Sequence, residues 1–503
     1  MGLRWEAFRE RIPGWAAAFA CGTLPAFAFP APACWWLAWV GLVPLLLVVR
    51  AAATSWAGAV RAWLGMGAFV LITQYWLASS IGPVLLLLAA LLGALWVPYG
   101  WIAHRLLSPP LPMGRMVAAL VVVPGAWVAA EAVRSLPLLG GPWAALGASQ
   151  WNRPMMLASA SLGGVWLTSL LLVAANTAVV CAILHRQVAG RLVMSAGAMA
   201  CAGLGPAWYL LGPAPDAAPS VRVALVQTGD IADVVARQAA SEALTATLVD
   251  QRPDLVVWGE SSVGADLTSH PDVLDRLKEL SRRVGADLLV NVDAPAPGGG
   301  IHKSAVLVGE SGLLGSYRKS RLVPFGEYVP LRPLFGWTTR YSKAAAVDRQ
   351  RGAGPVVLHA GRLAIGPLIS YEVTFPDLAR LEQHLGAQLL VYQSSTSSFQ
   401  SSWAQPQLAG QPAVRAVEEG RAAVHVGLSG DSSVFDARGR ELAWCPSDFR
   451  GVKIVSVPLG SNATLYQRTG DWVLVTAFVA VGAAVGFAVL RRHRGPAHDR
   501  LRG

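Results

Sequence analysis

The sequence predicts a polytopic α-helical membrane protein that carries one water-facing α/β domain. Hydrophobic residues make up 54% of the chain and charged residues only 14%, which is far more apolar than an ordinary soluble protein. Most apolar stretches lie before residue 212, and after it short β-branched runs alternate with helix-like segments. These two patterns indicate two kinds of structure in one chain.

Eight apolar stretches have the length that a helix needs to cross a bilayer. They lie at about 13–29, 33–49, 56–78, 83–103, 116–133, 158–185, 192–212 and 471–490. We therefore expect a membrane domain of seven transmembrane helices (1–212), a water-facing domain (213–468), and a final transmembrane helix with a basic tail (469–503). The Pro/Ala segment "LGPAPDAAPSVR" marks the first boundary.

The distribution of arginines predicts the orientation of the spans. If the N-terminus is cytoplasmic, the cytoplasmic side holds Arg4, Arg9, Arg11, Arg50, Arg61, Arg105, Arg115, Arg186, Arg191 and the five arginines of the tail. The short loops on the opposite side hold only Arg134 and Arg153. Under the positive-inside rule, both termini are cytoplasmic and residues 213–468 lie outside the cytoplasm.

Charge and cysteine content argue against two further classes of function. The net charge of +11 is concentrated beside the spans rather than in a stripe on the water-facing domain, so we expect no nucleic-acid partner. Four of the five cysteines fall in apolar spans and Cys445 is alone in the polar part. No disulfide framework, metal or other cofactor follows from that spacing.

The water-facing domain is predicted to contain eight strands separated by helices. The strands are "VRVALVQT", "DLVVWGE", "ADLLVNVD", "KSAVLVG", "RLAIGPLISYE", "AQLLVYQSS", "RAAVHVGLSG" and "GVKIVSVPL", and helical stretches lie near 231–250, 269–284, 374–385 and 408–420. Nearly continuous apolar strands that alternate with helices favour a sheet covered by helices.

Three segments place polar residues where predicted strands end. "DLVVWGESS" ends in Glu260, "YRKSRLVPFGEYVP" carries Lys319 and Glu327 around a Pro/Gly loop, and "ISYE" supplies Ser370 and Glu372. Each has a structural alternative: a solvated turn carboxylate, a surface lysine and a capping serine. The chain has only five lysines, so a retained lysine suggests that a compact charge matters at that position.

Taken together, these segments resemble the Glu-Lys-Cys triad of the carbon-nitrogen hydrolase (nitrilase) superfamily. With its spans, the chain resembles the bacterial apolipoprotein N-acyltransferase family through "YRKSRLVPFGEYVPL", "YEVTFPD", "RAVEEGR" and "LYQRTGDW". The resemblance implies an extracytoplasmic αββα sandwich on the bacterial inner membrane. It also implies Glu260 as general base, Lys319 as support for the oxyanion, Glu327 as the residue that orients the lysine, and Ser370 in the place of the nucleophilic cysteine.

The resemblance further implies a two-step acyl transfer through an acyl-enzyme. An acyl chain would pass from a phospholipid to the nucleophile, and then to the α-amine of the diacylglyceryl-cysteine of a lipoprotein. Some relatives look to be associated with a polyprenyl-phosphate mannose synthase, which is a further possible partner. We expect substrate contacts from Tyr371, Glu372, Phe335 and Trp337. The latter two lie in "LRPLFGWTTRY", either an arm that dips into the lipid interface or an ordinarily packed loop.

Ser370 changes the chemistry that the family pattern implies. A hydroxyl is a much weaker acid than a thiol, and serine nucleophiles normally use a histidine or lysine base. The nearest histidines in sequence, His359 and His384, have no evident triad role. We therefore expect the chain to bind the acyl donor but to form an acyl-enzyme slowly or not at all.

Two explanations of the serine stay open: an engineered cysteine-to-serine substitution that traps substrate, and a naturally inactive paralogue. We favour a cysteine-to-serine change in an active enzyme, because the flanking Glu260, Lys319 and Glu327 are retained. Two other functions also stay open. One is a non-catalytic membrane scaffold that binds lipid or lipoprotein, and the other is a membrane-tethered amidase that uses Ser370 directly.

Overall fold

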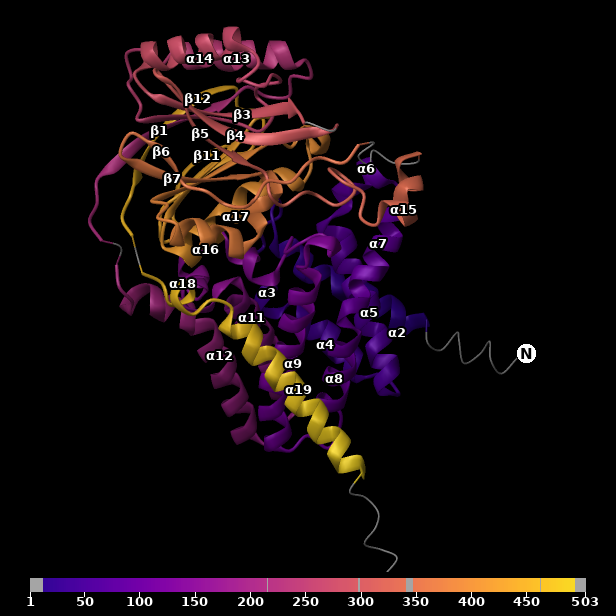
Figure 1. Cartoon of the computed structure of the whole chain (residues 1–503). Helices are drawn as coiled ribbons and strands as arrows, with labels where there is room; N and C mark the ends of the chain where they lie inside the picture. Colours follow the sequence, from indigo (N-terminus) through magenta and orange to yellow (C-terminus); the bar gives the residue numbers. More distant parts are fainter. Residues whose placement is uncertain (1–11, 215, 297–298, 341–346, 462, 494–503) are drawn as a thin grey trace, which may run out of the picture.

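The computed structural model describes residues 12–214, 216–296, 299–340, 347–461 and 463–493. Helices occupy the chain up to residue 211 and again after residue 464, and two β-sheets lie between them in sequence. In Figure 1 the sheets form a separate body above a bundle of helices. Both kinds of structure that the composition predicts are therefore present.

The bundle consists of long helices joined by short ones (Figure 1). Its α-helices are α2 Ile12–Thr23, α3 Leu37–Val40, α4 Leu42–Arg50, α5 Ser55–Thr73, α6 Ala78–Ile81, α7 Val84–Gly93, α8 Val97–Leu107, α9 Met113–Arg134, α10 Pro154–Leu157, α11 Ala160–Leu184, α12 Val188–Leu211, α18 Leu465–Thr469 and α19 Trp472–His493. Within the described chain, five helical stretches are long and apolar enough to span a membrane: Ser55–Thr73, Val84–Leu107, Met113–Arg134, Ala160–Leu184 and Val188–Leu211.

The remaining predicted spans correspond to shorter apolar helices. The stretch 13–29 begins as α2 and ends in a 3₁₀ turn, Leu24–Ala28, while 33–49 is divided between α3 and α4. The last predicted span coincides with α19, whose apolar part is Trp472–Phe487. The count of eight spans therefore stays a prediction, and the bundle itself is that of a membrane protein.

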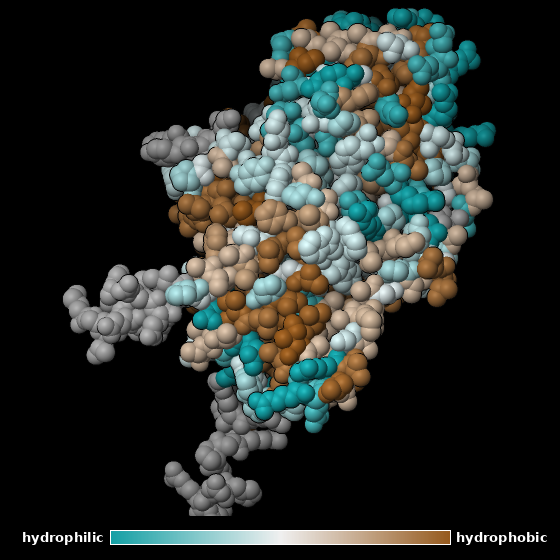
Figure 2. Space-filling model, turned by 180° about the vertical axis from the view of Figure 1, so that it is seen from behind, coloured by the Kyte–Doolittle hydropathy of each residue, from teal (hydrophilic) through white to brown (hydrophobic). Residues whose placement is uncertain are grey.

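Apolar side chains gather on the surface of the bundle, as Figure 2 shows for one face. α12 is the least buried of the five long stretches. Its large exposed apolar side chains are Val188, Leu192, Val193, Met199, Leu204, Leu210 and Leu211. A helix with so many exposed apolar side chains suits contact with lipid rather than with water.

The helix α11 is broken close to the sheet body. Gly163 and Gly164 leave the helical conformation, and Gly164 has a φ of 69°, which favours glycine. The break frees the backbone N–H of Val165, which donates to Glu418 Oε1 over 2.6 Å. Glu418 belongs to α17 (Ala404–Glu419), so a side chain from the sheet body completes a helix of the bundle.

Among the residues that the structure describes, the sheet body has twelve strands in two six-stranded sheets. The first sheet has the order β12-β1-β2-β3-β4-β5 and the second β11-β10-β9-β8-β7-β6. The strands are β1 Ser220–Gln227, β2 Leu255–Trp258, β3 Asp287–Pro295, β4 Ile301–Gly309, β5 Gly312–Arg318, β6 Leu358–Ala360, β7 Leu363–Ile369, β8 Leu389–Ser394, β9 Ala422–Gly427, β10 Ser432–Phe435, β11 Glu441–Cys445 and β12 Gly451–Pro458.

The sheet body has four layers, because helices cover both outer faces. α13 (Val234–Ala246) and α14 (Pro271–Val284) cover the first sheet, while α16 (Pro376–His384) and α17 lie between the second sheet and the bundle (Figure 1). At the centre of the second sheet, β7, β8 and β9 run parallel and are completely buried. This burial explains their continuous apolar sequences.

All eight predicted strands are present, but the prediction missed β5, β6, β10 and β11. These four strands pair antiparallel with a neighbour. β5 and β11 carry exposed residues, β6 spans only Leu358–Ala360, and β10 begins with two serines. Such strands lack the long apolar run by which the others were recognised.

Candidate active site

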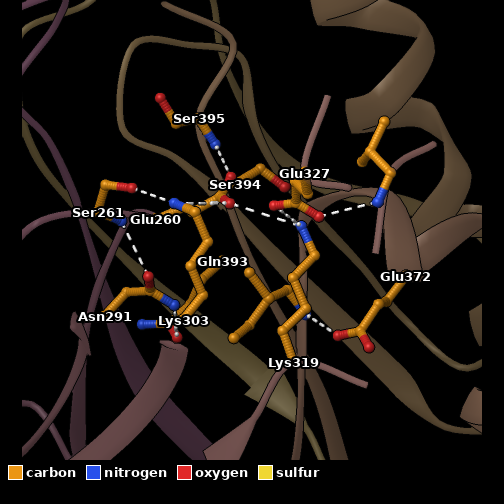
Figure 3. A network of polar contacts seen from close by, with 12 residues as sticks. Glu260, Ser261, Asn291, Lys303, Lys319, Glu327, Glu372, Gln393, Ser394 and Ser395 are labelled. Atoms are coloured by element: carbon orange, nitrogen blue, oxygen red, sulfur yellow. Dashed lines mark hydrogen bonds and ion pairs between the residues drawn. The ribbon is translucent and has the colours of Figure 1, made fainter. Parts of the chain in front are cut away.

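Glu260 lies directly beyond β2 and is 5% exposed. Its Oε2 accepts a hydrogen bond from the backbone N–H of Ser395 over 3.0 Å. Its Oε1 lies 3.1 Å from Lys303 Nζ and 3.7 Å from Lys319 Nζ. Both oxygens of this carboxylate are therefore engaged, and Figure 3 shows the two ammonium groups approaching it from different strands.

Lys319 follows β5 directly and is 1% exposed. Its Nζ donates to Glu327 Oε1 over 2.9 Å. The backbone N–H of Val323 donates to Glu327 Oε2, and Arg349 Nη1 donates to Oε1. Glu327 therefore fixes the position of the Lys319 ammonium, as a residue that orients the lysine would do.

Ser370 lies at the end of β7, where the strand turns sharply into the 3₁₀ turn Ser370–Thr374. Its φ is 55°, a left-handed conformation that costs a residue other than glycine about 1–3 kcal/mol. A sharp turn of this kind after a strand displays the nucleophile in α/β-hydrolases. The residue is half-buried, so the hydroxyl lies at the edge of the sheet rather than in its core.

Glu372 holds the Ser370 turn against the segment that follows Lys319. Its Oε1 accepts from the backbone N–H groups of Ser320 and Arg321, each over 2.8 Å, and from the hydroxyl of Tyr317. Its Oε2 accepts from the backbone N–H of Ile369. The carboxylate is completely buried, so its contacts fit a positioning role, and the expected substrate contact stays a prediction.

Charge balance sets the protonation of this cluster. Burial alone would raise the pKa of Glu260, but Lys303, Lys319 and Arg349 outweigh it and lower that pKa to about 2. Burial opposes the charge of Lys319, yet Glu327, Glu260 and Glu372 together raise its pKa. At neutral pH the site therefore holds an ionised carboxylate beside an ionised ammonium.

The sequence prediction missed Lys303 and Ser395. Lys303 comes from β4 and Ser395 from the loop after β8, and neither strand end carries a recognisable motif. A polar bridge between the sheets holds these strand ends in place. Asn291 Nδ2 donates to Gln393 Oε1 over 3.2 Å, and Gln393 Nε2 donates to the carbonyl of Trp258 over 2.9 Å (Figure 3).

The structure also brings a histidine close to the site, on β9. His425 Nε2 lies 2.8 Å from Ser394 Oγ, at the end of the strand next to β7. Burial lowers the pKa of His425 to about 4, so it is a neutral and weak base. The two histidines nearest to Ser370 in sequence, His359 and His384, are both exposed. The contact of His425 with Ser394 therefore fits a buried structural histidine.

The other predicted contact residues lie around this centre. Tyr371 is buried, and its ring meets Phe375 at a centroid distance of 4.9 Å. Phe335 is half-buried against Phe325, whereas Trp337 is 56% exposed. The arm "LRPLFGWTTRY" continues to Tyr341, which lies outside the described residues. The exposed tryptophan fits an arm at a lipid interface.

The arrangement suits nucleophilic acyl transfer. An ionised carboxylate can accept a proton, a buried ammonium can stabilise an oxyanion, and a side chain on a strained turn can attack a carbonyl. Within the described ranges, no group of three or more histidine, cysteine, aspartate or glutamate side chains is arranged to hold a metal ion.

Comparisons with known proteins agree with the resemblance seen in the motifs. The family model "Apolipoprotein N-acyltransferase N-terminal domain" matches residues 21–178, and "Carbon-nitrogen hydrolase" matches residues 222–466. Among solved structures, an amidase from Nesterenkonia sp. is 20% identical, with a TM-score of 0.38 over 53% of this chain and 99% of its own.

Curated relatives match the chain over nearly its whole length. The apolipoprotein N-acyltransferase of Azotobacter vinelandii is 32% identical and is covered over 97% of both chains. Those of Pseudomonas aeruginosa and Geobacter metallireducens are 29% and 28% identical, over 100% and 94% of both chains respectively. The chain therefore belongs to the apolipoprotein N-acyltransferase family, a membrane branch of the carbon-nitrogen hydrolase superfamily.

Proposed function

We propose that the chain carries a site for acyl transfer from a phospholipid to the α-amine of a diacylglyceryl lipoprotein, with Ser370 in the place of the nucleophile. The observation that carries this proposal is the buried Glu260–Lys319–Glu327 network, which Glu372 joins to the strained turn of Ser370. The nucleophile would attack the ester carbonyl and give its proton to Glu260. Lys319 would stabilise the oxyanion, and the leaving lysophospholipid would take up the proton.

The second half-reaction would transfer the acyl chain to the lipoprotein. The α-amine has a pKa of roughly 8, so part of it is neutral at working pH. It would attack the acyl-enzyme and form an amide, while its proton passes through Glu260 back to the nucleophile. Trp337, which is 56% exposed, would meet the lipid interface where both substrates reside.

With serine at position 370, this chain is a poor catalyst of acyl transfer. A thiol has a pKa of about 8.5, and a serine hydroxyl gives up its proton far less readily. Glu260, with a pKa of about 2, is a weak base for either group. We infer that the native chain binds the acyl donor and turns it over slowly or not at all.

The Ser370→Cys variant tests this proposal. Incubated with phospholipid vesicles, it should form an acyl thioester that intact-mass spectrometry detects, and it should N-acylate a diacylglyceryl peptide. The Ser370→Cys/Glu260→Gln variant is the matched control and should form neither product. A folded Ser370→Cys variant without adduct or product would count against acyl transfer. An oxyester on native Ser370 would instead support the amidase alternative.

We also propose that the sheet body lies outside the cytoplasm, on the inner membrane of a bacterium. The bias of arginines toward the opposite side of the spans supports this orientation. A green fluorescent protein fused after residue 503 should fluoresce, since it folds in the cytoplasm. A phosphatase fused after residue 212 should be active only if that position is extracytoplasmic. The opposite pattern would reverse the orientation.

A second candidate function is a scaffold that binds lipid or lipoprotein without turnover. The observation that favours it is the contact of Lys303 with Glu260, which occupies the expected base. Such a scaffold could anchor a polyprenyl-phosphate mannose synthase. Co-purification of the two proteins from membranes would support that association, and an inactive Ser370→Cys variant that still binds lipoprotein would favour the scaffold.

A further inference from the structure

Lys303 is a buried cation in the candidate site whose role the family pattern leaves open. It lies on β4, opposite Asp293 of β3 in the antiparallel register, and is 5% exposed. Its Nζ lies 3.1 Å from Glu260 Oε1 and 3.1 Å from Asp293 Oδ1, and it donates to Ser261 Oγ. The ammonium is therefore held between two carboxylates, and one of them is the expected general base.

Distances indicate which cation balances which carboxylate. Lys303 is the nearer ammonium to Glu260, at 3.1 Å against 3.7 Å for Lys319. Lys319 is closer to Glu327, at 2.9 Å. Because attraction falls with distance, Lys303 is the main counterion of Glu260, while the charge of Lys319 is largely balanced by Glu327.

The charges of this cluster nearly cancel. In the described part of the chain it contains the cations Lys303, Lys319 and Arg349 and the carboxylates Glu260, Glu327 and Asp293, with Glu372 as a further buried carboxylate near Lys319. A proton that moves from the nucleophile to Glu260 would neutralise one of the two carboxylates that hold the buried Lys303 ammonium and would leave Asp293 as the other. Weakening the pairing of a buried charge is costly, so this proton transfer is disfavoured.

We propose that Lys303 is a positioning residue that holds Glu260 ionised and weakens it as a base. The chain then has a weakened general base as well as a weak nucleophile. This inference rests on the proposed acyl-transfer function and extends it. Restoring the nucleophile alone would recover only part of the activity. Neutralising Lys303 would remove one positive charge from the cluster, and the proton transferred to Glu260 would then replace that charge.

The test compares the Ser370→Cys variant with the Ser370→Cys/Lys303→Met variant. Both are reconstituted in vesicles of phosphatidylethanolamine and phosphatidylglycerol, and the acyl thioester on residue 370 is followed by intact mass. We expect the double variant to form it at least about tenfold faster, since a well-matched general base contributes about 10²–10⁴-fold. The rate should also fall at acidic pH only in the double variant, because its Glu260 then becomes protonated.

Three control variants separate charge from packing and stability. Lys278→Met, placed in the Ser370→Cys background, removes a partly exposed lysine bonded to Asp275 and should leave the rate of thioester formation unchanged. Lys303→Arg keeps the charge and should give no gain in rate. Adding Glu260→Gln to the double variant should abolish the gain. Thermal melting and size-exclusion chromatography confirm that each variant is folded.

Alkylation of residue 370 by iodoacetamide distinguishes failure of this inference from failure of the proposed function. Equal thioester formation in the single and double variants would overturn the role of Lys303 and leave acyl transfer intact. If neither variant formed a thioester but alkylation were still faster in the double variant, the role of Lys303 would be supported and acyl transfer would be overturned. No thioester and equal alkylation would overturn both.

Discussion

Two clusters of buried carboxylates lie in different parts of the sheet body, one around strand ends of the first sheet and one between the second sheet and the bundle, and they differ in the number of neighbouring cations. The site cluster consists of Glu260, Lys303, Lys319, Glu327 and Arg349, in which every carboxylate has a cation within 4 Å. The interface cluster consists of Glu382, Arg415, Glu418 and Glu419, between the sheet and the bundle. There Arg415 pairs with Glu418 at 3.0 Å.

The other carboxylates of the interface cluster lack such partners. In the described chain, no hydrogen bond reaches either carboxylate oxygen of Glu382 or of Glu419. Burial raises the pKa of both well above the ordinary value and raises that of Glu418 to about 7. In the site cluster, the neighbouring cations instead lower the pKa of Glu260 to about 2. Equally buried carboxylates in the two clusters thus have pKa values shifted in opposite directions. The number of nearby cations decides the direction of the shift.

The interface cluster connects the bundle with the turn of Ser370. Glu418 accepts from the backbone of Val165 at the break of α11, and Arg415 Nη1 donates to the carbonyl of Thr374 over 3.4 Å. Arg415 and Glu418 belong to the "RAVEEGR" segment. This segment therefore has a structural role, because it connects the helices of the bundle with the turn that carries the expected nucleophile.

The largest effect is expected when a cation of the site cluster is removed. The Lys319→Met change leaves Glu327 and Glu260 with fewer counterions in a buried site, and we expect it to cost about 3–5 kcal/mol of unfolding free energy. Chemical denaturation in detergent micelles measures the loss. Lys278→Met is the matched control, since its ammonium is partly exposed. Equal losses in both variants would mean that the site cluster does not stabilise the fold.

The pH dependence of stability should reveal the interface cluster. The pKa of Glu418 is raised in the folded state, so its contribution is fully present below about pH 4.5 and is lost as the pH rises through about 7. Stability should fall by about 3 kcal/mol over that window, since one pKa unit corresponds to about 1.4 kcal/mol. The Glu418→Gln variant should lose this part of the slope between pH 4.5 and 7, while Glu382 and Glu419, whose pKa values are also raised, keep their parts.

Glu260 supplies the opposite slope and serves as the comparison. Its pKa is lowered, so its contribution is present above about pH 4.5 and is lost as the pH falls toward 2. Glu260→Gln should therefore flatten the acid limb and leave the slope from pH 4.5 to 7 unchanged. If the two substitutions altered the same pH window, the contrast between the clusters would be wrong.

A smaller effect is expected at the break of α11. In Gly164→Ala, the added Cβ would lie 2.6 Å from the ring of Tyr466, and the backbone would keep a φ of 69°. We expect a loss of about 1–3 kcal/mol from strain and close contact. Gly203→Ala in α12 is the control, because its Cβ would meet no atom within 4 Å. Thermal melting of both variants should separate them, and equal melting temperatures would argue against strain at the break.

The smallest effect is expected at Glu382. Burial raises its pKa well above the ordinary value, so the side chain is already neutral and a glutamine is close to it in shape and charge. Below about pH 4, where the side chain is neutral in the unfolded state as well, Glu382→Gln should change the unfolding free energy by about 1 kcal/mol or less. A loss as large as that of Lys319→Met would show that Glu382 is ionised, which would contradict the difference between the clusters.

The sequence was sufficient for those features that depend on local pattern. Apolar runs indicated the membrane part and eight of the strands, and the motifs around Glu260, Lys319 and Ser370 indicated the family. Residues at strand ends can be found in this way because a strand and its following loop are continuous in sequence. The turn of Ser370 and the lysine beside Glu327 were recognisable for the same reason.

Only the tertiary structure revealed which side chains meet. Lys303 reaches Glu260 because β3 and β4 pair antiparallel in a register that the alternation of their residues does not specify. Glu418 reaches Val165 because a helix of the bundle breaks beneath α17. Both contacts join distant segments, and their energies depend on burial and on the number of neighbouring charges. These quantities exist only after the chain has folded.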